Sequence, residues 1–477
     1  MRVLLISESP QVLGGIPTYT VPLAEALCEA GADVSYCYSS SMLQTLALFP
    51  GVRLRRHDHQ GVQYFDIQNS LRQPSGAARP MMDVRGPQIE KAFVRVLDEV
   101  RPDVVHVHSM AGLAASLVEL AARHAPVVVT HHEYWWLCAR RLLVRSDGRL
   151  CAGDTNPAEC ALCCQDARWW PFVLGSVVDS AFGHGTWRSL VAQIRGGSRA
   201  GGTSRTRVES PSSLVGATKL RESTEVHSIR KTALPRILSE VVAVNLAVSN
   251  IVRQRLVESG VDETKVQVHH IGTLAGSRVH PIPRDTSPGE ATFVTLGGLS
   301  DTKGTRVVLG ALAEIAGSKA WRALIYGGAR ADYVAQVTRL SEGLPVTFMG
   351  RYRHQDLSEI LAEADFVIVA PTIDDTSPQV VFEAFAAGVP VIGARIGGIP
   401  DFVQDGVNGL LFNPGDPRDL ARALGAVLLQ PNPSVYLRDG VKRPRSIEVE
   451  AIEMMDLYTN LAHRASSSLA GRVAVGG

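Results

Sequence analysis

The stretch of sequence that decides the fold reads DDTSPQVVFEAFAAGVPVI and spans residues 374–392. A helix is expected from Val380, and Val389 to Ile392 indicates a short buried strand. Residues 397–401 then read GGIPD, so a glycine turn follows that strand. A helix, a buried strand and a glycine turn in this order predict one unit of an α/β domain with a parallel sheet.

The same alternation of strands and helices extends through both halves of the chain. In the C-terminal half, strands are expected at 292–296, 322–326, 346–349 and 366–370, and helices from about residues 305 and 357. In the N-terminal half, strands are expected at 3–6, 32–38, 103–108, 127–129, 241–248 and 266–271, and helices at 18–30, 89–100, 113–123 and 250–258.

The pattern therefore predicts two α/β domains with parallel sheets. The first spans residues 1–280 and the second spans residues 290–446, with a polar, Pro-rich linker at 276–289. A final helix at 447–463 is followed by a Ser-, Ala- and Gly-rich stretch at 464–477, which we expect to be a loose tail. A cleft between two such domains is the default place for a ligand.

Composition excludes several classes of protein. Apolar residues make up 45% and charged residues 20%, which is ordinary for a globular chain and argues against wholesale disorder. Lys plus Arg number 48 against 47 Asp plus Glu, and this balance argues against nucleic acid as a partner. No run of 18 apolar residues predicts a membrane-spanning helix. The apolar start at residues 1–6 is too short for a signal peptide, so we expect a cytoplasmic protein.

A basic segment interrupts the pattern at about residues 183–231, where nine Lys or Arg stand against three Asp or Glu. Its Gly-, Ser- and Pro-rich composition favours a flexible, solvated insertion. One alternative is a basic surface that meets an anionic membrane or acceptor, and it would allow peripheral membrane contact. A nucleic-acid role is the weaker alternative, because no aromatic residue lies among the basic ones between Arg188 and Lys231.

Five of the seven cysteines fall at residues 138–164. Cys160 and Cys163 form a CxxC pair, and Cys138 and Cys151 lie upstream in a loop. Thiolates arranged in this way can bind structural zinc or an iron–sulfur cluster, although the spacing is not that of a standard zinc ribbon. Reduced or redox-labile thiols are the alternative.

Glycine pairs occur where strands hand over to helices, at 14–15, 297–298, 327–328 and 397–398. Each could present backbone N–H groups to a phosphate. None has the spacing of a dinucleotide-binding fingerprint or of a P-loop.

The 374–401 segment closely resembles the donor-binding region of family 4 of the retaining GT-B glycosyltransferases. Members carry two acids separated by seven residues, then EAxAxGxPVI and a GG turn; here the acids are Asp375 and Glu383. The resemblance extends to residues 302–304, to Gly350, to residues 406–409 and to the glycine loop at 14–15. It implies a GT-B fold, in which two Rossmann-like domains with parallel sheets face a central cleft. It also implies that the final helix crosses back onto the first domain.

The resemblance implies a role for each matching position. Glu383 would bind the ribose hydroxyls of a nucleotide sugar, and Asp375 the hydroxyls of the sugar itself. Lys303 would stabilise the charge that develops on the diphosphate as the glycosidic bond breaks. The other expected donor-binding positions are Gly14, Gly15, Gly298, Gly327, Arg351, Thr376, Ser377, Pro378 and Val380. No cofactor or metal is expected to be needed for the transfer.

The sequence departs from the family pattern at two positions. Asp375 stands where the family usually has Glu, and Gly298 stands where it tends to place Arg. The second positive charge at the diphosphate could come instead from Arg306, Arg330 or Arg351.

Histidines follow two strands of the first domain. His108 ends one strand at its carboxyl end, where open α/β sheets bind ligands. By resemblance it would lie near the donor sugar and the acceptor hydroxyl. Of the pair that follows the next strand, His132 is the better candidate for the cleft, and His106 is expected to pack in the sheet.

The combined interpretation is a retaining glycosyltransferase of the hexosyltransferase type. It would use a nucleotide-diphosphate sugar, with UDP or GDP expected, and a hydroxyl acceptor on a cell-surface glycan, a lipid-linked sugar or a secondary metabolite. Alternatives are another GT-B chemistry, such as nucleotide-sugar epimerisation or phosphorolysis, and a non-catalytic protein whose cysteine loop binds metal or senses redox state.

Overall fold

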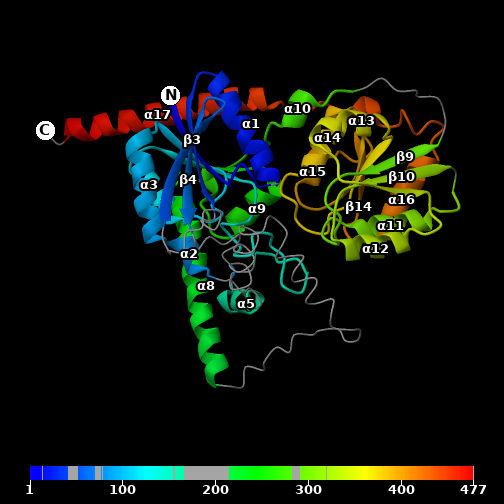
Figure 1. Cartoon of the computed structure of the whole chain (residues 1–477), viewed down its shortest axis with the longest axis horizontal. Coiled ribbons are helices and arrows are strands. Elements are labelled where there is room, and N and C mark those ends of the chain that lie inside the picture. The colour runs from blue at the N-terminus through cyan, green and yellow to red at the C-terminus, as the bar shows by residue number, and fades with distance from the viewer. Residues whose placement is uncertain are drawn as a thin grey trace. The chain divides into compact units, whose positions relative to one another are not determined.

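The computed structural model describes residues 1–12, 14–40, 52–69, 77, 79–153, 156–165, 214–281, 290–318 and 320–475. The chain forms two compact units (Figure 1). The N-terminal unit comprises Met1–Leu246, Arg255–Gln267 and Met454–Gly477. The C-terminal unit comprises Ala247–Gln254 and Val268–Glu453.

The N-terminal unit is built on an eight-stranded sheet with strand order β3-β4-β2-β1-β5-β6-β7-β8. The pairs β4-β2, β2-β1, β1-β5 and β5-β6 are parallel, and only β3 pairs with β4 in the antiparallel direction among the strand pairs whose register is described. The strands are β1 (Arg2–Ser7), β2 (Asp33–Ser40), β3 (Val52–His59), β4 (Val62–Asn69), β5 (Val104–Val107), β6 (Val127–His131), β7 (Val244–Ala247) and β8 (Val266–Val268).

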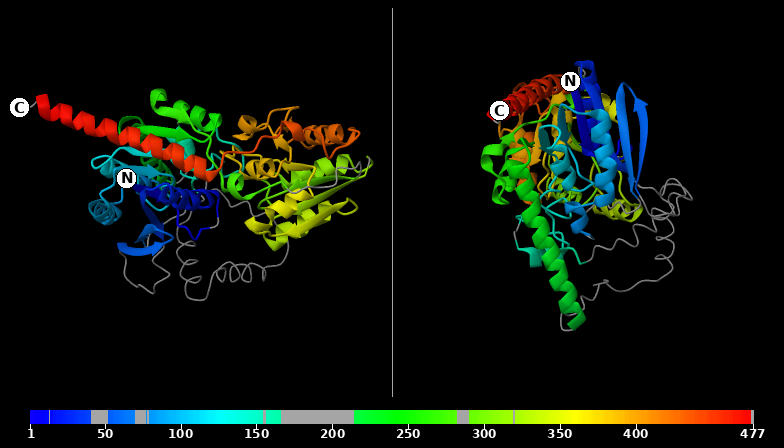
Figure 2. Two further views of the ribbon diagram at one scale, coloured as in Figure 1. Left: turned by 90° about the horizontal axis from the view of Figure 1, so that it is seen from above. Right: turned by 90° about the vertical axis from the view of Figure 1, so that its left-hand side faces the viewer.

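Helices connect these strands. They are α1 (Gly15–Glu29), α2 (Met81–Val84), α3 (Pro87–Val100), α4 (Ser116–Ala121), α5 (Pro157–Cys163), α8 (Leu214–Glu240) and α9 (Asn250–Glu258). The last helix, α17 (Ile447–Val475), begins in the C-terminal unit and continues in the N-terminal unit (Figure 2). There the hydroxyl of Tyr458 lies 2.6 Å from Nδ1 of His106 on β5.

The C-terminal unit has a six-stranded, fully parallel sheet with strand order β11-β10-β9-β12-β13-β14. Its strands are β9 (Ala291–Thr295), β10 (Trp321–Tyr326), β11 (Val346–Gly350), β12 (Phe366–Val369), β13 (Val391–Ala394) and β14 (Gly409–Phe412). Its helices are α10 (Leu274–Arg278), α11 (Thr305–Glu314), α12 (Ala331–Leu340), α13 (Leu357–Ala362), α14 (Gln379–Ala386), α15 (Ile399–Phe402) and α16 (Pro417–Leu428).

The central strand β12 of this second sheet is buried on both faces, which explains its wholly apolar sequence FVIV. Successive side chains of a strand point to opposite faces. On β9, Phe293 packs with the residues of α11 and α16, whereas Val294 packs with those of α13 and α14. The two α/β domains with parallel sheets that the sequence predicts are therefore confirmed.

The structure differs from the sequence-based expectations at several elements. The last part of the basic segment is not a loop, because α8 is a helix from Leu214 that continues to Glu240. β7 is accordingly shorter than the predicted strand at 241–248. Part of the predicted linker is the helix α10, and the expected tail continues α17 to Val475.

Residues 183–213 of the basic segment, residues 282–289 of the linker and the last two residues of the tail lie outside the described residues. Among the helices that the structure describes, none is both long enough and apolar enough to cross a membrane.

Candidate functional site

Three glycine turns lie side by side at the carboxyl ends of β9, β10 and β11. A Cβ atom on Gly327 would lie 1.7 Å from the carbonyl oxygen of Gly297, so only glycine fits this approach. The N–H of Gly327 in turn donates to the carbonyl of Gly350 over 2.7 Å. The turns expose backbone at the edge of the sheet where α/β proteins bind ligands.

Arg351 lies against these turns. A Cβ on Gly328 would lie 2.7 Å from Nε of Arg351, so the guanidinium fits here because residue 328 has no side chain. Of the three arginines left open by the sequence, Arg306 donates to Asp301 and Arg330 pairs with Asp332. Arg351 has no ion pair with any residue that the structure describes, and it is therefore the best placed to supply the charge absent at Gly298.

The next turn places Lys303 beside Asp375. Gly304, with a φ of 74°, approaches the carbonyl of Ala370 so closely that a Cβ would lie 1.8 Å from the oxygen. This contact fixes the turn that precedes α11. Nζ of Lys303 then donates to Oδ2 of Asp375 over 2.7 Å. Half of the lysine side chain remains exposed, so its ammonium can also reach a ligand.

The backbone at Asp375 is fixed from its other side by the turn after β13. A Cβ on Gly397 would lie 2.3 Å from the carbonyl oxygen of Asp375, and one on Gly398 would lie 2.4 Å from that of Thr376. The N–H of Gly398 donates to the carbonyl of Asp375 over 2.7 Å. The glycine pair that the sequence singles out thus positions the first acid of the motif.

Glu383 lies in α14 and is 8% exposed. Its Oε1 atom lies 3.7 Å from Nε2 of His354, and its Oε2 atom has no hydrogen-bond partner among the described residues. Burial raises the pKa of this carboxyl from 4.5 to about 7. A buried, unsatisfied carboxylate oxygen costs folding free energy, so its presence points to a ligand that donates to it.

Residues just before α14 complete this side of the unit. Pro378 is the residue before the helix, and Val381 N–H donates to its carbonyl over 3.0 Å. The hydroxyl of Ser377 is buried without a partner in the described part of the chain. Thr376 and Val380 flank this turn and are half-buried. Backbone N–H groups at the start of a helix favour negative charge.

In the N-terminal unit, His108 follows β5 and is 2% exposed. Its Nδ1 atom lies 3.1 Å from Nε2 of His132, and the two rings stack with centroids 5.3 Å apart. The ring of Tyr19 lies against both histidines. Burial, followed by the nearby His106 and His132, holds the pKa of His108 well below 6.5. The imidazole is therefore neutral, and its Nε2 atom has no hydrogen-bond partner among the described groups.

The neighbouring histidines have structural contacts. His106 is buried in the sheet between the hydroxyls of Tyr458 and Thr130, as expected from the sequence. His131 lies 3.0 Å from the side chain of Asn245 through Nε2. His132, rather than His131, contacts His108.

Gly14 and Gly15 stand at the start of α1. Gly14 precedes the helix in an extended conformation, and a Cβ on Gly15 would meet no atom within 4 Å. Four of the predicted site residues belong to the N-terminal unit, namely Gly14, Gly15, His108 and His132. The remaining predicted donor-binding and catalytic residues belong to the C-terminal unit.

Sequence reasoning missed a charged cluster at the carboxyl edge of the first sheet. Arg141 forms ion pairs with Glu8, which follows β1, and with Glu133, which follows β6. The hydroxyl of Ser109, after β5, donates to Glu133 over 3.2 Å. Burial alone would lower the pKa of Arg141, but the two carboxylates raise it overall. The signal that could have found the acids is their position just after parallel strands.

The candidate metal ligands Cys138, Cys151, Cys160 and Cys163 line one small pocket of about 30 Å³. None of them forms a disulfide.

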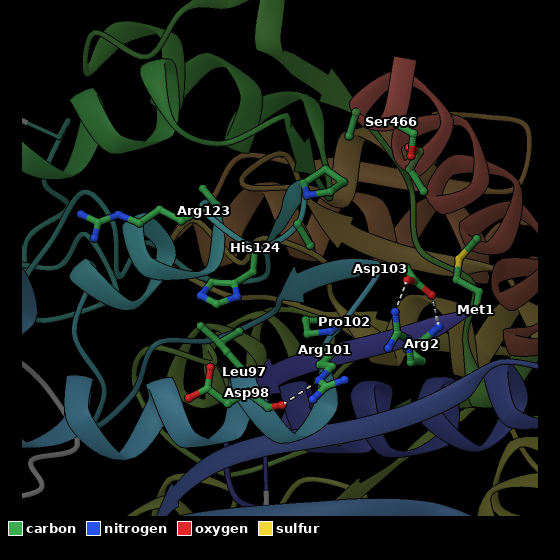
Figure 3. Close-up of a pocket in the computed structure, with 15 residues that line it drawn as sticks. Met1, Arg2, Leu97, Asp98, Arg101, Pro102, Asp103, Arg123, His124 and Ser466 are labelled. Carbon is green, nitrogen blue, oxygen red and sulfur yellow. Dashed lines mark hydrogen bonds and ion pairs between the residues drawn. The ribbon is translucent and has the colours of Figure 1, made fainter. Parts of the chain in front are cut away.

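A separate, open hollow of about 1050 Å³ lies at the opposite edge of the first sheet (Figure 3). Arg2 at the start of β1 and Asp103 before β5 form an ion pair in its lining. Because this is the amino edge of the strands, the hollow lies away from the edge at which parallel sheets bind ligands.

Comparison with protein families finds two matches. Residues 290–430 match the family described as Glycosyl transferases group 1. Residues 14–163 match the family described as Glycosyl transferase 4-like domain. Each match covers most of the sheet of one unit.

Curated relatives match shorter segments. The sulfoquinovosyl transferase SQD2 of Arabidopsis thaliana is 40% identical over 99 residues, which is 20% of this chain and 19% of the relative. The D-inositol 3-phosphate glycosyltransferase of Mycolicibacterium smegmatis is 31% identical over 184 residues, which is 35% of this chain and 41% of the relative. The aligned segments thus span less than half of either relative.

Similar solved structures extend over nearly the whole chain. A sucrose-phosphate synthase from Thermosynechococcus elongatus has a TM-score of 0.60 and 17% identity, and the match covers 96% of this chain and 98% of that one. Anabaena HepE in complex with UDP and glucose has a TM-score of 0.56 and 15% identity, covering 97% of this chain and 100% of that one. The fold is GT-B, as the sequence predicts.

Proposed function

Since residues 14–163 and 290–430 match two glycosyltransferase family models, we propose that the chain is a retaining hexosyltransferase. It would transfer a sugar from a nucleotide-diphosphate sugar to an acceptor hydroxyl. The solved complexes of Anabaena HepE contain UDP and UDP-glucose, which favours a UDP-sugar donor over a GDP-sugar.

The observation that carries the proposal is the buried carboxyl of Glu383, whose Oε2 atom has no partner in the described chain. The two hydroxyls of a ribose are donors that a carboxylate can accept together. A ligand that supplied them would satisfy the buried oxygen and would hold the carboxyl in its ionised form. This assignment matches the role that the sequence resemblance implies.

The diphosphate of the donor would lie between the glycine turns and the start of α14. Lys303 and Arg351 supply two positive charges there, and the turns at Gly298 and Gly327 supply backbone N–H groups. Such preorganised groups stabilise charge that develops on a leaving group without reorganisation at the moment of reaction.

Asp375 would accept hydrogen bonds from hydroxyls of the donor sugar. In the absence of ligand, its carboxylate is neutralised by Lys303. Binding of a diphosphate would draw the lysine toward the phosphates, and this would leave Asp375 available for the sugar. One ion pair would therefore be exchanged for two contacts with the donor.

Retention is proposed to follow a front-face route. The bond between the anomeric carbon and the phosphate oxygen breaks, and the acceptor oxygen bonds to the same face of that carbon. The acceptor proton passes to the leaving phosphate oxygen, so no protein carboxylate need form a covalent intermediate. His108, neutral because its pKa is held well below 6.5, would hydrogen-bond a sugar hydroxyl through Nε2.

The acceptor is proposed to bind the N-terminal unit at the carboxyl edge of its sheet, near His132. A cell-surface glycan, a lipid-linked sugar or a small secondary metabolite fits this description. The basic residues at 183–231 favour an anionic or membrane-proximal acceptor.

The test is turnover with product analysis. The purified protein is incubated with UDP- and GDP-sugars, with and without a panel of hydroxyl acceptors, and free nucleotide and sugar products are separated by chromatography. The proposal expects acceptor-dependent release of one nucleoside diphosphate. Proton NMR of the product should show the same anomeric configuration as in the donor. Conversion of the donor to another nucleotide sugar without acceptor would instead identify an epimerase, and an inverted product would rule out retention.

A further inference from the structure

The loop after β6 brings four cysteines together from three backbone segments. Cys138 follows the turn at Tyr134, whose carbonyl accepts from the Cys138 N–H over 2.7 Å. Cys151 follows a short antiparallel bridge between Val144 and Leu150, and its N–H donates to Leu143 over 2.7 Å. Each segment is thus held by its own backbone hydrogen bonds.

The third segment is α5, which carries Cys160 and Cys163. Their spacing of three residues places both side chains on one face of the helix. The helix start is fixed by Asn156, whose side chain accepts from the Ala158 N–H over 3.0 Å. Arg140 then joins the helix end to the rest of the loop, because its guanidinium donates to the carbonyl of Cys163 over 3.1 Å.

The four thiols influence one another's ionisation. Burial raises the pKa of Cys160 and Cys163, and Cys138 and Cys151 each raise both further. Two cations oppose this effect: Lys231 of α8 lowers the pKa of Cys160, and Arg140 lowers that of Cys163. Thiolates gathered around a divalent cation would carry excess negative charge, and these two side chains would offset it.

The remaining cysteines are placed differently. Cys164 also lines the pocket, but it is buried and packs with Ala77 and Ala139 in a small apolar cluster. Cys28 and Cys37 lie on α1 and β2, far from the loop in sequence. This leaves Cys138, Cys151, Cys160 and Cys163 as the pocket cysteines that do not belong to that apolar cluster.

The number of thiols and the spacing of their sulfur atoms bear on the ligand. Four thiolates are the ligand set of a closed, structural zinc site. Among the described cysteines, no three sulfur atoms lie within 4.8 Å of one another. Tetrahedral zinc, with bonds of about 2.3 Å, would bring them about 3.8 Å apart, and this requires rotation of side chains on a backbone already held in place.

We propose that Cys138, Cys151, Cys160 and Cys163 bind one Zn²⁺ as a closed, structural site. The expected consequence of metal binding concerns Arg141, which lies three residues after Cys138. That guanidinium bridges Glu8 and Glu133 at the carboxyl edge of the sheet. The metal would hold the loop so that Arg141 keeps these two acids in place. This inference is independent of the proposed transfer reaction.

The test is the metal content of the full chain, purified without chelator and measured by plasma mass spectrometry. The proposal expects about one zinc per chain in the wild type. The zinc content should be at least tenfold lower in Cys160→Ser and in Cys151→Ser. Cys28→Ser and Cys164→Ala are the matched controls and should keep their zinc. Absence of zinc from the wild type after reconstitution, iron with sulfide in its place, or equal loss in Cys164→Ala would overturn the proposal.

A second measurement uses only the wild-type chain, in case the serine variants do not fold. Cobalt is added to the apoprotein prepared by chelation, and the near-ultraviolet and visible spectrum is recorded. Four thiolate ligands in a tetrahedron predict an intense thiolate-to-cobalt band and visible bands of a tetrahedral ion. A spectrum of octahedral cobalt without the thiolate band would contradict the assignment.

Discussion

Nζ of Lys303 lies 2.7 Å from Oδ2 of Asp375, so one ion pair joins the turn before α11 to the loop before α14. Both backbones are fixed by glycines, Gly304 on one side and Gly397 on the other. The pair is thus a product of two close backbone approaches rather than of side-chain flexibility. Because the lysine side chain is half exposed, the pair itself should stabilise folding by less than about 1 kcal/mol.

Lys303→Met should therefore separate activity from stability. We expect kcat/KM to fall by about 100- to 1000-fold, because a preorganised charge at the leaving diphosphate is lost. The midpoint of thermal unfolding should change little. Arg306→Met is the control, since Arg306 pairs with Asp301 and should be nearly neutral for activity. Equal losses in the two variants would remove Lys303 from the site.

Arg351→Met should weaken binding of the nucleoside diphosphate more than it weakens binding of the nucleoside monophosphate. The guanidinium lies against Gly328, next to the turn that lacks the family arginine. We expect about a tenfold rise in Kd for the diphosphate, measured by calorimetry, which corresponds to one charged contact. Arg330→Met removes an exposed arginine paired with Asp332 and should leave Kd unchanged. A larger rise in Kd for Arg330→Met than for Arg351→Met would assign the diphosphate contact to Arg330 instead.

Glu383 should make the protein less stable as pH rises. The carboxyl loses its proton near pH 4.5 when unfolded but keeps it to about pH 7 when folded, because burial raises its pKa. The folded state thus binds more protons in this window, and the free energy of unfolding should fall by about 3 kcal/mol across it.

Urea denaturation of wild type and Glu383→Gln at several pH values measures this effect. The difference between them should grow from pH 4.5 to 7 and then level off, with Glu383→Gln the more stable above pH 7. Glu359→Gln, at an exposed position of α13, should track the wild type at every pH. A constant difference between wild type and Glu383→Gln would show that this carboxyl ionises normally.

Gly397→Ala should damage the site and the fold together. Its φ is 62°, and the new Cβ would lie 2.3 Å from the carbonyl oxygen of Asp375. We expect a loss of about 1–3 kcal/mol in the free energy of unfolding. Gly425→Ala, within α16 with nothing near its Cβ, should instead gain about 0.5–1 kcal/mol. Circular dichroism during thermal unfolding distinguishes the two, and a neutral Gly397→Ala would contradict the close approach.

His108→Ala should lower turnover and spare nucleotide binding, because His108 belongs to a different unit from Lys303 and Glu383. We expect kcat/KM to fall by about 100-fold with an unchanged thermal shift by the nucleotide. The wild-type rate should show no titration of this histidine between about pH 6 and 8, because burial holds its pKa well below 6.5. His124→Ala, exposed at the opposite edge of the sheet, is the control. Lost nucleotide binding in His108→Ala would contradict this division.

Local pattern was sufficient for the α/β core, because strands such as β12 and β13 are buried along their whole length and are therefore apolar. It was insufficient for β3, whose sequence from Val52 to His59 is mostly polar and exposed at the sheet edge. It also missed the start of α8, where the basic, Ser- and Gly-rich composition masks helical continuation to Glu240.

For the candidate site, spacing along the chain was enough to propose Asp375 and Glu383, because one short segment carries both. Choosing Arg351 over Arg306 and Arg330 needed the packing of separate turns, which no local pattern records. The Arg141 cluster was missed for the same reason, since Glu8 and Glu133 are 125 residues apart in sequence and meet only through the sheet.

The most direct test of the central claim is nucleotide binding measured by thermal shift. UDP, GDP, dTDP and ADP, each with its common sugars, are compared on wild type, Glu383→Ala and the control Glu359→Ala. A ligand at 100 times its Kd stabilises the fold by about 2.7 kcal/mol. The account predicts that one nucleotide stabilises wild type and Glu359→Ala and fails to stabilise Glu383→Ala. Equal stabilisation of Glu383→Ala, or no stabilisation of wild type by any of the four, would contradict it.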